Sequence, residues 1–377
     1  MVERIRMHHA PFSVSRIIHP VGQGAFYTER IIVDDRCYNI VYDCGAGNRK
    51  QASTVLKREI SSYYTPDDII DILFVSHFDN DHINGINELI RHTGGIKNIV
   101  VPLIDKSDFW FYCVENDNFR SFYNSLEEIA EKVYKVKSAF EDDRNINDIR
   151  PLDLSEGGKG SSIVQNATKM LLGKNIDWCY IPFNYDQKNR ISILKIELSK
   201  YGITEDVLCD NWEVIAEHLD EIKKAYKNVV SDGANKTSLI LYSGGLIGDY
   251  DCEIHQYNWP FYYYSPYVFR VEGCLYFGDN DLNQLNLLYG LQRQLGPLKD
   301  RIGTIQVPHH GAIKNFNNQI LHIFRYHSPV LYFASFGKHN SYGHPSYRVV
   351  EDIEYYNPFI GVTEDRNSAL VEIIYPR

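Results

Sequence analysis

The stretch Ser76-His77-Phe78-Asp79-Asn80-Asp81-His82 decides how this sequence is interpreted. It follows a continuous apolar run typical of a buried strand and precedes INELIRHTGG, which has the pattern of a short helix closed by two glycines. The stretch holds two imidazoles and two carboxylates, which are ligands for zinc, manganese or iron. Alternation in an extended segment directs side chains 77, 79 and 81 toward one side. A single member can also be explained as a turn or capping residue, but the four together predict a metal site.

Further polar residues follow other predicted strands. Asp279 comes directly after the apolar run CLYF and its glycine, and His309 and His310 follow IQVP. Lys338 and His344 follow LYFASFG. An α/β fold commonly builds its site from side chains at strand ends. A turn remains an equal interpretation for Asp279 or His344 taken singly.

The chain has 377 residues, enough for two or three structural units. Strand-like runs alternate with a helical pattern and predict an α/β fold over residues 1–105 and 231–377. Residues 106–230 are predicted to be a mainly helical insertion or subdomain, because apolar residues recur there at helical spacing. The two helical patterns are Phe122, Leu126, Ile129, Val133, Val136 and Phe140, and Trp212, Ile215, Leu219, Ile222 and Tyr226.

Composition excludes several classes of protein. Hydrophobic residues make up 44% and charged residues 23%, which argues against a disordered, collagen-like or disulfide-dense chain. No apolar run is long enough to span a membrane, and no basic segment followed by an apolar one opens the sequence. The seven cysteines form no CxxC pair, which favours buried thiols over disulfides or a thiolate zinc site. We therefore expect a cytoplasmic protein that does not bind membranes.

The net charge of −10 argues against a polyanionic partner at first sight. Residues 282–350, however, contain seven lysines and arginines and a single acid, Asp300. A local basic field can attract a phosphate-bearing ligand even on an acidic protein. Separate solvated charges are an equally good interpretation of this stretch.

The motifs VSHFDNDHINGI, LYFGD, VPHHGA and FGKHNSYGHPS together resemble the metallo-β-lactamase superfamily. Within it, the sequence is most similar to the ComEC-like hydrolase domain of DNA-uptake competence proteins. The resemblance covers roughly residues 15–105 and 235–377. It implies an α/β fold of four αββα layers, a metallo-β-lactamase sandwich with a two-metal site at its strand ends. The mainly helical insertion expected from the apolar spacing lies outside the resemblance.

The resemblance also implies metal ligands at two positions: His77 and Asp79 at the first, Asp81, His82 and His309 at the second, and Asp279 between them. Asp43 would orient ligands from behind. The family's usual third-motif histidine has no counterpart in residues 233–238, so the first position lacks one ligand. We expect two divalent ions, zinc or manganese with magnesium as an alternative, because Asp79 makes the first position rich in oxygen.

The leading functional hypothesis is a metal-dependent phosphodiesterase, specifically a nuclease that hydrolyses DNA or RNA with a metal-activated hydroxide. Asp81 would take part in catalysis as a metal ligand. His310, Lys338 and His344 are candidates for protonating the leaving group or stabilising its charge.

Three alternatives remain. The first is a metal-dependent hydrolase of a small substrate, such as a cyclic nucleotide, lactone, thioester or amide, with the insertion as a lid. The second is a di-iron protein that reduces oxygen or nitric oxide, although no flavodoxin-like or iron–sulfur pattern is present. The third is a non-catalytic interaction module that binds a protein partner through the insertion or the tyrosine-rich segment 257–267. Salt dependence separates a polymer-binding nuclease from the first alternative.

Overall fold

The computed structural model describes most of the chain. The described residues are 12–47, 50–104, 109, 112–113, 119–138, 149–185, 193, 196–204, 217–229, 238–256, 268–269, 271–324 and 329–377.

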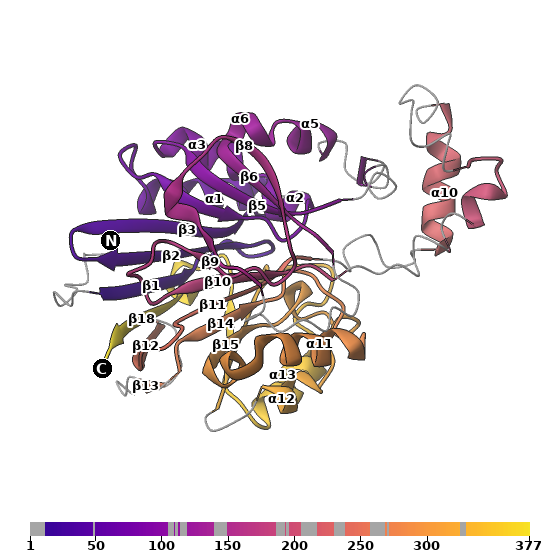
Figure 1. Ribbon diagram of the computed structural model, residues 1–377. Coiled ribbons are helices and arrows are strands. Elements are labelled where there is room, and N and C mark those ends of the chain that lie inside the picture. Colours follow the sequence, from indigo (N-terminus) through magenta and orange to yellow (C-terminus); the bar gives the residue numbers. More distant parts are fainter. Residues whose placement is uncertain are drawn as a thin grey trace.

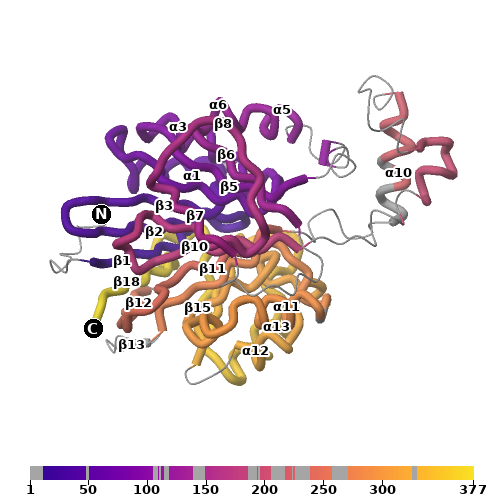
Figure 2. Tube along the Cα trace, viewed as in Figure 1, coloured from indigo at the N-terminus to yellow at the C-terminus, as the bar shows by residue number. Residues whose placement is uncertain are grey.

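The first sheet combines an antiparallel half with a parallel half. Its strands in spatial order are β13 (Val268–Phe269), β12 (Tyr250–Gln256), β18 (Leu370–Pro376), β1 (Phe12–Ile18), β2 (Phe26–Val33), β3 (Arg36–Cys44), β4 (Ile70–Phe74), β5 (Ile96–Pro102), β6 (Ala130–Val136) and β8 (Gly160–Val164). Strands β3 to β8 in this order are mutually parallel. Figure 2 shows the yellow β18 beside the indigo β1, two segments from distant parts of the chain.

The second sheet is also mixed. Its strands in spatial order are β17 (Phe359–Val362), β16 (Leu331–Ser335), β15 (Ile302–Gln306), β14 (Gly273–Tyr276), β11 (Ile240–Gly244), β10 (Cys179–Phe183), β9 (Met170–Leu171) and β7 (Leu152–Asp153). Strands β14, β15, β16 and β17 are parallel, and β11 runs antiparallel to β14.

The two sheets face each other and helices cover both outer faces (Figure 1). A core between the sheets contains Phe74 of the first sheet and Tyr276 of the second. A separate core lies under the helices of the first sheet and a third under those of the second. The order helix, sheet, sheet, helix confirms the predicted four-layer αββα architecture.

The helices of the first layer are α1 (Lys50–Tyr63), α2 (Asn80–Ile83), α3 (Ile86–His92), α5 (Phe119–Asn124) and α6 (Leu126–Ile129). Those of the fourth layer are α11 (Leu285–Leu295), α12 (Ile320–Ile323) and α13 (Tyr347–Glu354). Short 3-10 turns are η2 (Leu154–Glu156), η3 (Gly296–Arg301), η4 (His309–Gly311) and η5 (Arg366–Ser368). Helix α10 (Leu219–Val229) lies away from both sheets in Figure 1.

The prediction of a mainly helical insertion over residues 106–230 is wrong for its described residues between 130 and 183. Strands β6 and β8 extend the first sheet, and β7, β9 and β10 extend the second. The predicted helix from Phe122 to Phe140 ends at Ile129, and β6 follows. Strand β6 pairs with β5 and β8 along its edges, and its Val133 and Val136 enter cores on opposite faces of the sheet. A strand buried on both faces therefore satisfies this apolar spacing as well as a helix would.

Several predicted features lie outside the described residues. They are Phe140, Trp212, Ile215, the tyrosine-rich segment 257–267 and residues 233–237 of the expected third motif. Leu219 and Ile222 lie in α10, as the second helical pattern predicts.

The described cysteines are free thiols. Cys44, Cys113, Cys179, Cys252 and Cys274 are buried, as expected, whereas Cys37 is exposed. Among the described residues, the structure contains no helix with the length and apolar character needed to cross a membrane.

A buried charged network joins the two sheets. The Arg16 side chain is 1% exposed and donates hydrogen bonds to Glu29 of β2, with Nε 2.7 Å from Oε1, and to Glu372 of β18. Glu29 also accepts hydrogen bonds from Tyr180 and Tyr276 on the second sheet, at 2.9 and 3.0 Å. Burial opposes the charged form of Glu29, but Arg16 outweighs it and lowers the pKa of this carboxyl. The charges of both buried carboxylates, Glu29 and Glu372, are therefore neutralised by the one guanidinium of Arg16.

Replacing Arg16 with methionine keeps most of the side-chain volume but leaves two buried carboxylates without their cation. We expect Arg16→Met to lower the free energy of unfolding by about 3–5 kcal/mol in urea denaturation. Arg91→Ala is the matched control, because Arg91 forms an exposed ion pair with Glu88 that is worth at most about 1 kcal/mol. Equal losses in the two variants would contradict this account of the network.

Candidate metal centre

The predicted site residues meet at one edge of the sandwich, where parallel strands of both sheets end. Strand β4 leads into the stretch from Ser76 to His82, and β3 ends beside Asp43. In the second sheet, β14 leads to Asp279, and β15 leads to the turn that carries His309 and His310. Because the carboxyl ends of parallel strands lie at the same edge, residues distant in sequence share one site.

Backbone geometry holds Asp43 and the segment Asp81–His82 together. Asp43 adopts a left-handed conformation with φ of 55°, which is uncommon outside glycine. Two residues later, a Cβ atom added to Gly45 would lie 2.3 Å from the carbonyl carbon of Asp81 and 2.5 Å from the nitrogen of His82. Glycine at this position therefore lets the strand end approach the metal-binding loop.

The buried carboxylate of Asp43 orients His82. Its Oδ2 accepts a hydrogen bond from His82 Nδ1 at 2.8 Å and from the Ser76 hydroxyl at 2.6 Å. Its Oδ1 accepts from the Ser76 backbone nitrogen at 2.7 Å. The hydrogen of His82 is thereby fixed on Nδ1, and His82 Nε2 lies 3.4 Å from Asp279 Oδ1.

His77 is held in the same way by a hydroxyl group. Its Nδ1 lies 2.8 Å from Ser76 Oγ, whose own hydrogen is donated to Asp43, so the ring donates to the hydroxyl. Ser238 Oγ lies 3.2 Å from the same nitrogen. His77 Nε2 is 3.7 Å from Asp279 Oδ2 and 3.9 Å from Asp79 Oδ2.

The two adjacent histidines face different carboxylates. His310 Nδ1 donates to the Ser335 carbonyl oxygen at 2.8 Å, and its Nε2 lies 3.4 Å from Asp81 Oδ2. His309 Nε2 lies 3.7 Å from Asp279 Oδ2. Both rings therefore direct Nε2 into the space between the carboxylates.

This arrangement fits divalent cations. A neutral imidazole whose hydrogen is on Nδ1 presents a lone pair at Nε2, and a lone pair facing a carboxylate is repulsive unless a cation lies between them. His77 Nε2, His82 Nε2, His310 Nε2 and Asp279 Oδ1 are buried without a hydrogen-bond partner. Ligand atoms lie within 4.8 Å of one another in two groups, namely His77, His82 and Asp279, and Asp81, His82 and His310.

Without metal, burial and the neighbouring charges shift the pKa values of the ligands in different directions. Burial lowers the pKa of His77 to about 4, and the nearby charge of His82 adds to this effect. Burial also opposes charge on His82, but Asp279 and Asp43 outweigh it and raise the pKa of His82 well above its usual range. Burial would raise the pKa of Asp81, but the nearby imidazole of His310 and the charge of His82 lower it to about 2.

The structure brings most of the predicted site residues together. The cluster contains five of the predicted ligands, namely His77, Asp79, Asp81, His82 and Asp279. The prediction that His309 joins Asp81 and His82 differs from the structure, in which His310 is grouped with them. His310, predicted as a proton donor, is thus placed with the metal-ligating side chains.

The two other proton-donor candidates have different surroundings. Lys338 Nζ lies 3.0 Å from Asp365 Oδ2, so an ion pair holds its amine. The His344 ring is 5.7 Å from the His309 ring, and burial together with the charges of His309 and His310 lowers its pKa to about 4. His344 is therefore neutral at neutral pH and lies beside the cluster.

Sequence reasoning missed the hydroxyl and amide groups that orient the ligands. Ser76 and Ser238 hold His77, and Asn315 Oδ1 lies 2.9 Å from His309 Nδ1. Serine and asparagine are common in loops for many reasons, so only Ser76, inside the metal-binding stretch, had a sequence signal.

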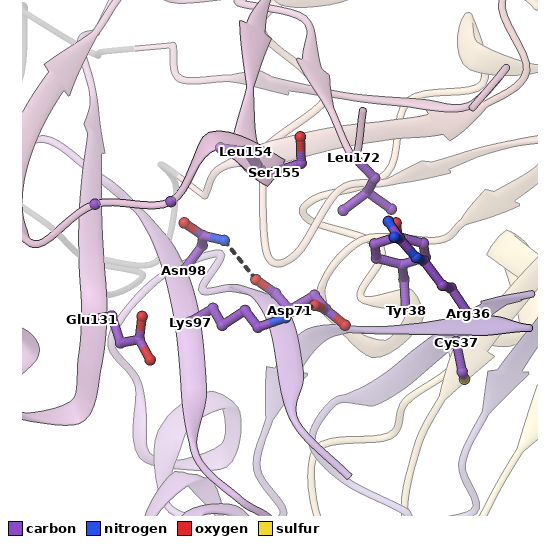
Figure 3. Close-up of a pocket in the computed structure, with 12 residues that line it drawn as sticks. Arg36, Cys37, Tyr38, Asp71, Lys97, Asn98, Glu131, Leu154, Ser155 and Leu172 are labelled. Atoms are coloured by element: carbon purple, nitrogen blue, oxygen red, sulfur yellow. Dashed lines mark hydrogen bonds and ion pairs between the residues drawn. The ribbon is translucent and has the colours of Figure 1, made fainter. Parts of the chain in front are cut away.

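A separate cavity of about 530 Å³ lies at the other end of the parallel strands (Figure 3). It is lined by residues near the amino ends of β3 to β6, including Tyr38, Asp71 and Glu131. Lys97 Nζ lies 2.7 Å from Asp71 Oδ1, and Asn98 donates to the Asp71 carbonyl oxygen at 2.9 Å. The metal-ligating cluster is not part of this cavity.

Comparison with solved structures finds similarity at low sequence identity. No protein-family model and no curated protein matches the chain. Among solved structures, the chain is similar to the metallo-beta-lactamase fold protein YhfI from Bacillus subtilis, with a TM-score of 0.40 and 7% sequence identity over 96% of this chain and 99% of that one. At this distance the likeness carries no argument about function, and the metal centre rests on the geometry of the cluster.

Removing the charge that orients His82 should weaken metal binding without unfolding the protein. Asparagine tolerates the left-handed backbone of Asp43 but cannot accept all its hydrogen bonds. We expect Asp43→Asn to lower zinc affinity by about 10–100-fold in calorimetric titration, with an unchanged circular dichroism spectrum. Wild-type affinity in this variant would contradict the orienting role of Asp43.

The raised pKa of His82 makes metal binding depend on pH. In the metal-free protein His82 keeps a proton at neutral pH, and a metal ion must displace it. We expect zinc affinity to rise with pH until the pKa of His82 is passed, and to fall as the solution becomes acidic. Calorimetry in two buffers with different ionisation enthalpies measures the released protons, and binding without proton release would contradict the prediction.

Proposed function

We propose that this chain is a metal-dependent hydrolase that acts as a phosphodiesterase on nucleic acid. The observation that carries the proposal is the convergence of His77, His82 and His310, each with Nε2 directed into the cluster, on the carboxylates of Asp81 and Asp279. Buried imidazole nitrogens that face carboxylates without a hydrogen-bond partner contribute nothing to packing. This argues against a purely non-catalytic interaction module.

The bound cations would supply a hydroxide nucleophile at neutral pH and neutralise charge on the attacked phosphoryl group. The protein's own part is to orient the ligands and to act on the leaving group. Asp43 and Ser76 fix the rings of His82 and His77. His344, which is neutral at neutral pH, donates an N–H hydrogen bond to the leaving oxygen from its position beside His309.

Two sequence features support a phosphodiester over other substrates. One is the resemblance to ComEC-like hydrolase domains, including Asp79 in place of an imidazole, which makes the first position suited to manganese or magnesium beside zinc. The other is the basic stretch 282–350. Two of its basic residues, Arg301 and Lys338, form ion pairs with Glu272 and Asp365.

The test is hydrolysis by the purified chain of labelled single- and double-stranded DNA, RNA and bis(p-nitrophenyl) phosphate, each with manganese, magnesium or zinc. We expect polymer cleavage that weakens steeply with added salt. Asp81→Ala should reduce it at least about 100-fold, because a direct ligand matters more than the residues that orient it. Asp67→Ala, which removes an exposed carboxylate outside both the cluster and the basic stretch, should leave it unchanged.

Other outcomes redirect the proposal. Cleavage of the small diester alone, with little salt dependence, would favour a small phosphodiester as substrate. Metal binding without turnover of any phosphodiester would contradict the proposal and favour lactone, thioester or amide hydrolysis.

A further inference from the structure

The set of ligands that the sequence predicts for the first metal position lacks one imidazole. His77 and Asp79 provide one nitrogen and one carboxylate, and Asp279 lies between the two positions. Where the family resemblance leads us to expect another imidazole, the described chain has Ser238, which accepts a hydrogen bond from the Asp279 backbone nitrogen at 2.9 Å. The Ser238 hydroxyl lies beside Nδ1 of His77 and not beside the nitrogen that faces the carboxylates.

Hydrogen bonds around Asn315 determine which nitrogen of His309 is available to a metal. The Asn315 amide nitrogen lies 3.1 Å from the Asp279 carbonyl oxygen and 3.4 Å from that of Asn280, so this group is the donor. Asn315 Oδ1 must then accept the hydrogen of His309 Nδ1, at 2.9 Å. With that hydrogen on Nδ1, Nε2 is the nitrogen of His309 that is available to a metal, and it lies 3.7 Å from Asp279 Oδ2.

Asp279 Oδ2 is also the oxygen that faces His77. The distance from His77 Nε2 to this oxygen is 3.7 Å, the same as that from His309 Nε2. The other oxygen, Asp279 Oδ1, faces His82 at 3.4 Å. The two oxygens of Asp279 thus divide the surrounding imidazoles into a set with His77 and His309 and a set with His82.

The two adjacent histidines lie in an unusual turn with left-handed backbone. His309 and His310 have φ values of 49° and 57°, and Gly311 continues with 83°. Left-handed backbone is unfavourable for a residue with a side chain, so the surrounding structure must hold it. The His309 nitrogen donates to the Gly278 carbonyl oxygen at 3.1 Å, which ties the turn to the residue before Asp279. As a result His309 faces Asp279, whereas His310 faces Asp81.

We propose that His309 supplies the missing imidazole of the first metal position, with His77, Asp79 and Asp279, and that His310 completes the second with Asp81 and His82. The adjacent histidines are then ligands of different metals. This inference rests on the two-metal centre of the proposed function, and it replaces the sequence-based assignment of His309 to the second metal.

The test measures metal content in the absence of any substrate. Zinc per chain is determined by mass spectrometry after equilibrium dialysis, and affinities by calorimetry, for the wild-type chain, His309→Gln and His310→Gln. We expect two zinc ions in the wild type and one in each variant, with the affinity for the lost ion reduced at least about 100-fold. His322→Gln, which removes an exposed histidine of α12, is the matched control and should keep both ions.

Double variants assign each histidine to a metal. Asp79→Asn with His309→Gln should lose no more than the one ion that either change loses, because both residues serve the same position. His309→Gln with His310→Gln should lose both ions. Loss of both ions in the first pair, together with loss of only one in the second, would overturn the assignment.

A measurement on the wild-type chain covers the case in which a variant does not fold. Diethylpyrocarbonate modifies accessible imidazoles, and the His309 side chain is 26% exposed. We expect zinc to protect His309 from modification, as detected by peptide mapping, while His322 stays reactive. Two zinc ions bound with His309 unprotected would overturn this inference alone, whereas a wild-type chain that binds no divalent metal would overturn the proposed function as well.

Discussion

The geometry of the candidate site depends on three hydrogen bonds that orient its imidazole rings. Asp43 accepts one from His82, the Ser335 carbonyl accepts one from His310, and Ser76 accepts one from His77. Each hydrogen bond fixes a ring so that its other nitrogen faces a carboxylate. Either a proton or a metal ion must then occupy the space between nitrogen and oxygen, because two groups of lone pairs repel each other in a buried environment.

The fold provides this geometry by ending strands of both sheets at one edge. Residues from β3 and β4 meet residues from β14, β15 and β16, and none of these strands could place the ligands alone. The network of Arg16, Glu29 and Glu372 joins the sheets within the sandwich. Its hydrogen bonds from Tyr180 and Tyr276 make the relative position of the sheets specific, which apolar packing alone defines less sharply.

Much of this architecture could be predicted from the sequence, because strands buried on both faces leave continuous apolar runs and their polar ends are visible beside them. The same rule failed at β6. Val133 packs toward the outer helices and Val136 into the core between the sheets, and their spacing fits a helix equally well. Only pairing with β5, more than thirty positions earlier at Ile99↔Val133, decides in favour of a strand.

The roles of His309 and His310 could not be predicted for a different reason. Neighbours in an ordinary strand point to opposite faces, but this pair lies in a left-handed turn whose dihedral angles leave no sequence signal apart from Gly311. The resemblance correctly directed attention to both residues, but their order along the chain could not show which carboxylate each would face. Asn315, which fixes the His309 tautomer, lies six positions further on and has no recognisable pattern.

The pairing of β18 with β1 also has a consequence for the order in which the protein folds. During synthesis β1 leaves the ribosome before its partner strand β18, and the carboxylate of Glu372 follows more than 350 positions after Arg16. Until then, one edge of β1 has no partner and Arg16 has only Glu29 as a counter-charge. Such a high contact order is typical of slow folding. An intermediate that lacks β18 exposes an unpaired strand edge to other chains, and pairing with β18 then removes this risk of aggregation.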